Sequence, residues 1–140
     1  MREKTLLLVK PDGVARGLSQ QIFERVENAG LKIEAKIKTI LTSLQAAELY
    51  QPHLGKQFYP GLIKFMTSGP IFACVVSGEN AIRCLRELMG DTDPLAAARG
   101  TIRGDLREAA VINEDGIIKN LVHGSDSPES AAREIAVFFK

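Results

Sequence analysis

The stretch Thr5-Leu-Leu-Leu-Val9 is continuously apolar, and Pro11 follows it closely. An uninterrupted apolar run of this length is typical of a β-strand that is buried on both faces. The stretch Pro70-Ile-Phe-Ala-Cys-Val-Val76 has the same character and ends at the turn signal Ser77-Gly78. The sequence therefore predicts two buried strands that lie far apart in the chain.

The segments around these two strands alternate between helical and extended patterns. Apolar residues recur at helical spacing from Leu18 to Ala29, and Gly30 follows where the C-terminal cap of a helix is expected. Apolar and charged residues alternate from Leu31 to Lys38, which indicates a half-exposed strand. We expect further helices over 43–50, 60–66 and 80–89 and from Ser127-Pro128-Glu129 onward, and a last strand over 117–122.

The order of these elements predicts the fold class. Strand, helix, strand, helices, strand, helix, strand and helix reduce, without insertions, to the split βαββαβ arrangement of ferredoxin-like α+β folds. We expect a four-stranded antiparallel sheet flanked by helices, with the helices on one face. The stretch 91–115 shows little pattern beyond a turn at Asp93-Pro94, and loops of that length are often functional.

Length and composition indicate one globular domain. The 140 residues suit a single compact domain, which we expect to span 1–140, and 45% of them are hydrophobic. The 18 basic residues nearly balance the 17 acidic ones, which gives a formal net charge of +1. This balance argues against a dedicated nucleic-acid-binding protein, which carries a basic excess, and against a disordered chain.

The sequence shows no targeting or metal-binding pattern. No stretch approaches the roughly 20 apolar residues of a membrane helix, and Lys10-Pro11 interrupts the first apolar run too early for a signal peptide. We therefore expect a cytoplasmic protein without membrane contact. Cys74 and Cys84 form no metal-ligand pattern with either histidine, and we interpret them as inert buried thiols.

The familiar phosphate-binding loops are missing. Gly55-Lys56 lacks the upstream glycine and the following Ser or Thr of a P-loop, and no G-x-G-x-x-G occurs. If the domain handles phosphates, side chains must bind them, and arginine suits this role because it donates two parallel hydrogen bonds. The candidate donors are Lys10, Arg86, Arg99, Arg103, Thr92, Thr101 and Asn120. A solvated surface position is the alternative for each arginine, and it is least favoured for Arg103.

The two histidines differ in their surroundings. His53 lies in a turn, where we expect an ordinary surface position, whereas His123 ends a predicted strand just before a helix start. Taken alone, a structural role for His123 is as good an interpretation as a catalytic one. However, Ser125 is near, and Glu134 lies on the apolar face of the last helix, where a carboxylate needs a partner. A neutral imidazole held by a carboxylate would be a nucleophile at physiological pH.

Four blocks of the sequence resemble the signature blocks of the nucleoside diphosphate kinase family. They are Lys10-Pro-Asp-Gly-Val14, Gly90-Asp-Thr-Asp-Pro94, Gly100-Thr-Ile-Arg-Gly-Asp105 and Asn120-Leu-Val-His-Gly-Ser-Asp-Ser127. Residues 129–135 are similar to the family's final helix. The resemblance runs in register over nearly the whole chain, and the block around His123 is highly specific.

The resemblance implies a ping-pong kinase that moves the γ-phosphate of a nucleoside triphosphate, mainly ATP, to a nucleoside diphosphate. His123 would carry the phosphate on its δ nitrogen, and Mg²⁺ would be held mainly by the substrate phosphates. The residues implied to orient or assist His123 are Glu134, Ser125, Lys10 and Tyr50. The residues implied to bind the nucleotide are Lys10, Phe58, Arg86, Thr92, Arg103 and Asn120, with Phe58 stacking on the base. The family also implies self-association as a tetramer or hexamer built from dimers.

Two departures from the family pattern stand out. Arg99 replaces the proline that usually precedes Gly-Thr-Ile-Arg-Gly, and we consider it a candidate for an extra phosphate contact. The connection 107–119 is several residues longer than in the commonest members and precedes the segment that carries Asn120 and His123. The alternative function is a ferredoxin-like nucleotide- or nucleic-acid-binding module without catalysis, because a fold does not fix a function. The balanced charge argues against nucleic acid as a partner.

Overall fold

A computed structural model describes residues 2–139, which form a four-stranded antiparallel sheet of order β2-β3-β1-β4. The strands are β1 (Arg2–Val9), β2 (Lys32–Thr39), β3 (Ile71–Glu79) and β4 (Val122–Gly124). The two apolar stretches become the central pair β1 and β3, in which Leu7 lies opposite Cys74. The predicted split βαββαβ fold class is therefore confirmed.

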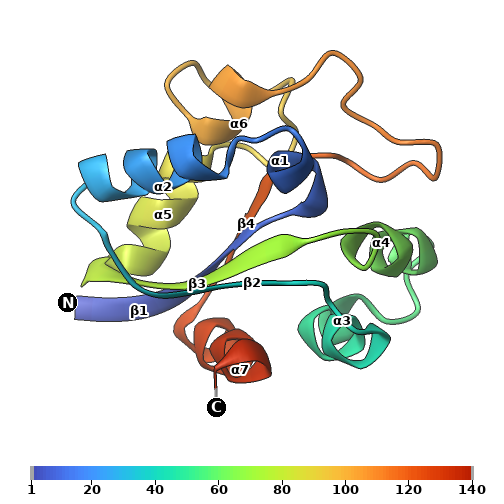
Figure 1. Cartoon of the computed structure of the whole chain (residues 1–140), viewed down its shortest axis with the longest axis horizontal. Helices are drawn as coiled ribbons and strands as arrows, with labels where there is room; N and C mark the ends of the chain where they lie inside the picture. The colour runs from blue at the N-terminus through green and yellow to red at the C-terminus, as the bar shows by residue number, and fades with distance from the viewer. Residues whose placement is uncertain (1, 140) are drawn as a thin grey trace.

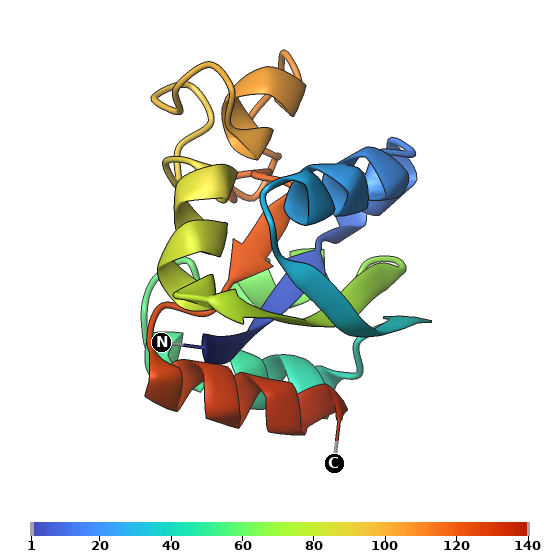
Figure 2. The same cartoon turned by 90° about the vertical axis from the view of Figure 1, so that its left-hand side faces the viewer.

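Helices cover both faces of this sheet, so the expectation of helices on one face was wrong. Figures 1 and 2 show α2 (Ser19–Asn28) and α5 (Ala81–Met89) on one side, and α3 (Ser43–Leu49), α4 (Tyr59–Met66) and α7 (Pro128–Phe138) on the other. Leu7 and Val9 pack in the cluster with α2 and α5, whereas Leu6 and Leu8 pack in the cluster with α3, α4 and α7. Because β1 is apolar on both sides, each side needs a cover.

Several short elements occupy the connections. The helix α1 (Pro11–Ala15) follows β1, the 3₁₀ turn η1 (Gln51–His53) follows α3, and α6 (Ile102–Leu106) lies within the stretch that showed little pattern. Thr101 caps α6 by accepting a hydrogen bond from the backbone nitrogen of Gly104. Ser127 caps α7 in the same way, as predicted from Ser127-Pro128-Glu129.

The last strand was predicted in the wrong place. The strand β4 begins at Val122, and the preceding residues fold into a short hairpin, residues 111–119, in which Ile112 pairs with Ile118. The backbone nitrogen of Lys119 donates to the Val111 carbonyl at 2.7 Å. Ile117 is buried in the cluster beside α4 rather than in the sheet. Its apolar character therefore reflects packing against a helix.

The described part of the chain bears out one of the two thiol predictions. Cys74 and Cys84 are both free, and Cys74 is buried as expected, but Cys84 is only half-buried on α5. Burial raises the pKa of the Cys74 thiol to about 12, so that thiol stays protonated and unreactive. Within residues 2–139, no helix has the length and apolar content required to span a bilayer.

Candidate active site

The alternation of β4 directs His123 toward α7. Val122 faces the cluster with α2 and α5, and Gly124 lies against α5, where an added Cβ would come within 2.7 Å of the Met89 sulfur. His123 lies between them and pairs with Leu8. The Leu8 side chain packs on the other face of the sheet from Val122, in the cluster with α3, α4 and α7. Successive residues of a strand point to opposite faces. The imidazole therefore lies on the side of the sheet that α7 covers.

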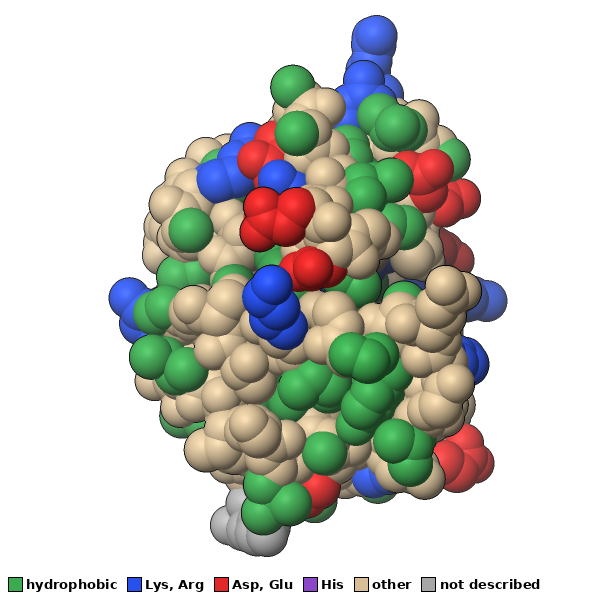
Figure 3. All heavy atoms as spheres, turned by 90° about the vertical axis from the view of Figure 1, so that its right-hand side faces the viewer, with side chains coloured by type: hydrophobic (Ala, Val, Ile, Leu, Met, Phe, Trp, Pro, Cys, Tyr) green, Lys and Arg blue, Asp and Glu red, His purple; other side chains and the backbone are tan. Residues whose placement is uncertain are grey.

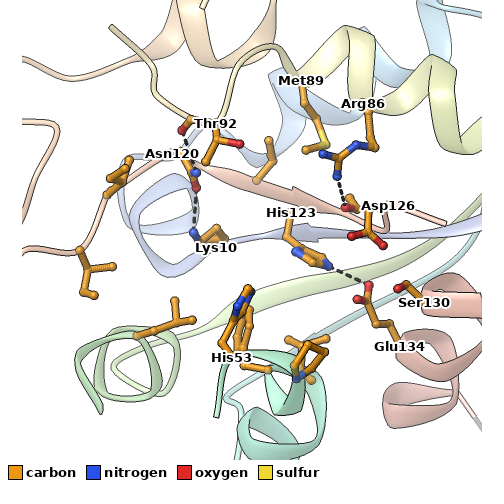
Figure 4. Close-up of a pocket in the computed structure, with 18 of the residues that line it drawn as sticks. Lys10, His53, Arg86, Met89, Thr92, Asn120, His123, Asp126, Ser130 and Glu134 are labelled. Atoms are coloured by element: carbon orange, nitrogen blue, oxygen red, sulfur yellow. Dashed lines mark hydrogen bonds and ion pairs between the residues drawn. The ribbon is translucent and has the colours of Figure 1, made fainter. Parts of the chain in front are cut away.

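Glu134 of α7 holds the imidazole from one side (Figure 4). The His123 Nε2 atom lies 2.8 Å from Glu134 Oε1, and the Ser125 hydroxyl donates to the same oxygen at 2.7 Å. Glu134 is only 5% exposed. Burial raises the pKa of this carboxyl, but the hydrogen bond and charge of His123 and the hydrogen bond of Ser125 outweigh burial, and the pKa is lowered.

This pairing determines which ring nitrogen is free. An ionised carboxylate only accepts hydrogen bonds, so the proton of the neutral imidazole belongs on Nε2, next to Glu134. The Nδ1 atom of His123 then keeps its lone pair. Ser125 is fully buried and lies behind the carboxylate, where its hydroxyl also accepts a hydrogen bond from the Leu6 backbone nitrogen at 3.3 Å. Ser125 thus supports Glu134 without reaching the cavity wall.

A series of rings leads away from His123. Tyr50 lies edge-on to the His123 ring with centroids 6.2 Å apart, His53 stacks on Tyr50 at 6.3 Å, and Phe58 lies 5.3 Å beyond His53. Burial and the charge of Glu134 raise the pKa of Tyr50, which keeps its phenol protonated. The expected ordinary surface position of His53 was wrong, because His53 lines the same cavity as His123. Burial and the nearby Lys56 lower the pKa of His53.

A chain of hydrogen bonds orders the cationic side of the site (Figure 4). Lys10 donates to the Asn120 side-chain oxygen at 2.7 Å, and the Asn120 amide donates to the Thr92 carbonyl at 3.0 Å. Lys10 is only 6% exposed. Burial, assisted by the charge of Arg103 and opposed by that of Asp12, lowers the pKa of Lys10 to about 8. A phosphate group near Lys10 would therefore meet a poorly hydrated cation.

The two arginines of the site donate hydrogen bonds to backbone carbonyls around it. Arg103 donates to the carbonyls of Asn120 at 3.1 Å, Gly90 at 3.0 Å and Val122 at 2.7 Å. Burial and the charge of Arg86 lower the pKa of Arg103 to about 10. Arg86, on the exposed side of α5, donates to the Gly124 carbonyl at 3.2 Å. Arg103 thus joins the end of α5 to the segment leading into β4.

An unusual backbone conformation separates Asn120 from β4. Leu121 has a φ of 72°, a left-handed conformation that a branched side chain rarely adopts. Two groups hold it there: Asp12 accepts a hydrogen bond from the Leu121 nitrogen at 3.0 Å, and the Lys10 nitrogen donates to the Leu121 carbonyl at 2.8 Å. Asp12 was not among the residues singled out from the sequence. Its position in the first turn of α1, two residues after Lys10, was the available signal.

These residues surround one cavity of about 620 Å³. Its apolar wall comes from α4 and the hairpin, and its polar wall comes from β4, α5 and α7. Of the site residues predicted from the sequence, the structure brings to this wall Lys10, Tyr50, Phe58, Arg86, Thr92, Arg103, Asn120, His123 and Glu134. Arg99 is exposed and does not line the cavity; its charge acts instead on Asp105. The cavity-lining residues that sequence reasoning missed include His53, Asp126, Arg133 and the hairpin residues Gly116, Ile117 and Ile118.

Comparison with known proteins identifies close relatives. The family model described as "Nucleoside diphosphate kinase" matches residues 3–140. Proteins with that name from Staphylothermus marinus and Methanosarcina barkeri are 50% and 48% identical to the chain over 138 residues. The matches cover 99% of this chain and 93% and 88% of those relatives, respectively.

Solved structures agree with the sequence comparison. A transition-state mimic of the nucleoside-diphosphate kinase from Borrelia burgdorferi, with bound vanadate and ADP, superposes with a TM-score of 0.91 at 38% identity and covers 99% of this chain and 88% of its own. The enzyme from Halobacterium salinarum in complex with CDP gives a TM-score of 0.89 at 45% identity and covers 100% and 89%. The fold, the family match and the relatives agree. This chain belongs to the nucleoside diphosphate kinase family.

Proposed function

We propose that Nδ1 of His123 carries the phosphoryl group between nucleotides in a ping-pong reaction. In the first half, the Nδ1 lone pair attacks the γ-phosphorus of a nucleoside triphosphate, a nitrogen–phosphorus bond forms, and the bond to the β,γ-bridging oxygen breaks. In the second half, a terminal oxygen of a nucleoside diphosphate attacks that phosphorus and the nitrogen leaves. The observation that carries this proposal is the 2.8 Å contact between Nε2 and buried Glu134.

Glu134 stabilises the charge that develops on the ring. As Nδ1 bonds to phosphorus, the imidazole becomes positive, and the adjacent carboxylate makes that charge favourable. The buried Ser125 hydroxyl fixes the same carboxylate oxygen at 2.7 Å, so Glu134 does not reorient during the reaction. The phenol of Tyr50, next to His123, supplies a neutral donor for the transferred group.

The polar wall suits phosphate chains. We assign the phosphate contacts to Lys10, Arg86 and Arg103, with Thr92 and Asn120 as neutral partners for phosphate or ribose oxygens. Phosphoryl transfer has a loose transition state in most analyses, so positioned positive charge supplies most of the catalysis. Lys10 and Arg103 are each more than nine-tenths buried, so little water competes for their charge.

The apolar wall suits a nucleobase. Phe58 is 44% exposed, and Leu62 and Ile117 line the cavity behind it. An aromatic ring can stack on any base, because every base presents a π-face. We therefore assign the base to Phe58 and expect little discrimination among nucleosides.

The Mg²⁺ ion would enter with the substrate. Within residues 2–139, no group of three or more His, Cys, Asp or Glu side chains is arranged to hold a metal. Magnesium keeps several waters and readily binds through substrate phosphates with one or two carboxylates. The donor set around the cavity, which is rich in cations and includes Asp126, fits an ion carried by nucleotide phosphate oxygens. When bound, the ion would neutralise phosphate charge.

We also propose that residues 1–140 act as one catalytic domain and that copies of it associate. Support for association comes from β2, which within residues 2–139 pairs only with β3, so that its other edge is open there. Ile37, Ile40 and Leu44, in and after β2, are 37%, 57% and 70% exposed. Figure 3 shows hydrophobic side chains gathered on the lower half of the face where α3 and α4 lie. We infer a cytoplasmic location from the two free thiols and the nucleotide substrates.

Labelled ATP tests the proposed function. The wild-type protein incubated with terminally labelled ATP and Mg²⁺ should retain the label in an acid-labile, alkali-stable form, and addition of a nucleoside diphosphate should release it. His123→Ala should abolish labelling. His53→Asn is the matched control, because it removes the second of the two histidines and should retain the label. A wild-type protein that binds nucleotide but stays unlabelled would contradict the proposal and favour a binding module.

A further inference from the structure

Arg133 of α7 contacts both the end of α3 and Glu134, the next residue of its own helix. Its Nη1 atom donates to the Glu48 carbonyl at 2.7 Å and lies 3.4 Å from that of Leu49. Its Nη2 atom lies 3.4 Å from Glu134 Oε2. One guanidinium thus spans the C-terminal end of α3 and the carboxylate that holds the imidazole.

The α3 contact meets a need of that helix. The last four carbonyls of a helix lack partners of the normal intrahelical kind, and they carry the negative end of the helix dipole. The last turn of α3 has no basic residue of its own. Arg133, from α7, supplies that positive charge next to the carbonyl of Leu49, the residue immediately before Tyr50.

The contact of Arg133 with Glu134 gives the second carboxylate oxygen a partner. Oxygen Oε1 of Glu134 receives hydrogen bonds from His123 and Ser125, whereas Arg133 approaches Oε2. With both oxygens engaged, rotation of the carboxylate would break at least two interactions. The planar guanidinium offers donors in fixed directions, which a lysine ammonium does not.

We propose that Arg133 is a positioning residue that couples Glu134 to the end of α3, and so fixes Glu134 and Tyr50 on either side of His123. This proposal rests on the proposed role of His123. Arg133 acts through Glu134 and the backbone. Its fork is occupied by the protein, although the side chain also borders the cavity and is 38% exposed.

The competing role for Arg133 is direct binding of substrate phosphate, and kinetics separate the two. A phosphate contact formed equally in the ground state and the transition state changes KM, whereas an orienting contact changes kcat. Charge gives a second distinction. The groups that face the Glu134 carboxylate are His123 and Ser125 from β4 and the turn after it, Tyr50 from the end of α3, and Arg133 itself. Loss of the Arg133 cation raises the pKa of Glu134.

The test compares Arg133→Gln and Arg133→Lys with the wild type. In Arg133→Gln we expect kcat to fall by about fivefold to tenfold with KM for nucleotide changed less than about twofold, and the acid limb of the pH profile to move to higher pH. Arg133→Lys keeps the charge, so it should restore the acid limb but only part of kcat. The matched control is Arg83→Gln, on the exposed face of α5, where Arg83 pairs with Glu87 at 3.6 Å. It should leave kcat, KM and the pH profile unchanged.

A spectroscopic readout keeps the test valid if stability changes. The chain has two histidines, so the ring-nitrogen NMR signals of His123 are readily resolved in folded protein. Wild type should show Nε2 protonated as a single tautomer, and Arg133→Gln should show a mixture. A raised KM with unchanged kcat would overturn the proposal, as would unchanged kcat, pH profile and tautomer. A wild-type protein that never acquires label would instead contradict the role of His123 itself.

Discussion

The two ends of the cavity are built differently. At the reacting end, buried and half-buried hydrogen bonds of 2.7 to 2.8 Å hold His123 of β4, Glu134 of α7, and Lys10 between β1 and α1. At the nucleoside end, the hairpin is attached to α4 by the Lys64–Asp115 ion pair of 3.0 Å, whose side chains are 69% and 35% exposed. Buried contacts with several partners fix the chemistry. The exposed ion pair is screened by water and contributes less than those contacts.

The hairpin also packs against α4 through apolar side chains. A Cβ added to Gly61 would lie 3.1 Å from the Ile117 side chain, so the missing side chain of Gly61 is what lets the hairpin approach. Ile117 is 5% exposed and belongs to the core cluster of that face. The longer connection noted in the sequence therefore forms part of the cavity wall rather than a free loop.

The largest effect on activity should come from removing the charge of Glu134 at the reacting end. Glu134→Gln keeps the size of the side chain but removes the charge that stabilises the imidazolium, so we expect kcat to fall by about a hundredfold. KM should change little, because Glu134 contacts the ring and not the nucleotide. Steady-state kinetics check this. A kcat within about threefold of wild type would show that Glu134 is not part of the catalytic arrangement.

The next effect should be on folding, at Asp12. Asp12→Ala leaves the Leu121 nitrogen buried without its partner and should lower the free energy of unfolding by about 1 to 3 kcal/mol. Asp93→Ala is the matched control, since Asp93 also accepts from a backbone nitrogen, that of Leu95, but on an exposed loop. Denaturant titration of the two variants measures the difference. Equal losses would mean that burial does not set the strength of the Asp12 contact.

The pH dependence of KM should depend on Lys10 at the reacting end and not on Lys64 at the nucleoside end. The pKa of Lys10 is lowered to about 8 by burial, so raising the pH through that value removes a proton, and with it the charge that binds phosphate. The KM for nucleotide should therefore increase when the pH is above the pKa of Lys10. Lys64 is exposed and its pKa is raised by Asp115, so Lys64→Ala should keep the same inflection. A KM that stays flat through this range would contradict the assigned role of Lys10.

The smallest effect should come from the exposed end. Lys64→Ala removes the ion pair with Asp115, and we expect KM for nucleotide to rise less than about threefold, with the difference vanishing at high salt. Gly61→Val should raise KM more, because its side chain would displace Ile117. A larger effect of Lys64→Ala than of Gly61→Val would show that the ion pair, and not the close packing, holds the hairpin.

The sequence carried much of this architecture because its signals are local. The apolar run Thr5–Val9 and the capped start at Ser127 predicted elements that the structure contains. Glu134 was expected against His123 because a carboxylate on an apolar helix face needs a partner, and the two side chains do meet. Ile117 was misplaced because an apolar segment packed on a helix and one packed in a sheet have similar patterns.

The rest of the site depends on contacts between distant parts of the chain. Asp12 reaches Leu121, and Arg133 reaches Glu48, through hydrogen bonds to backbone atoms, which leave no residue pattern at the accepting or donating position. His53 enters the cavity because η1 follows α3 directly, a geometry that a turn-like sequence does not specify. Side-chain types predicted the chemistry, and tertiary structure determined which further groups joined it.

The identity of the phosphorylated nitrogen tests the central claim most directly. Phosphorus NMR of the protein after reaction with ATP and Mg²⁺ distinguishes phosphate on Nδ1 from phosphate on Nε2 of histidine. Because Glu134 occupies Nε2 at 2.8 Å, the account predicts one signal, from Nδ1-phosphohistidine, that is absent in His123→Ala. A signal from Nε2-phosphohistidine, or phosphate on any other residue, would contradict it.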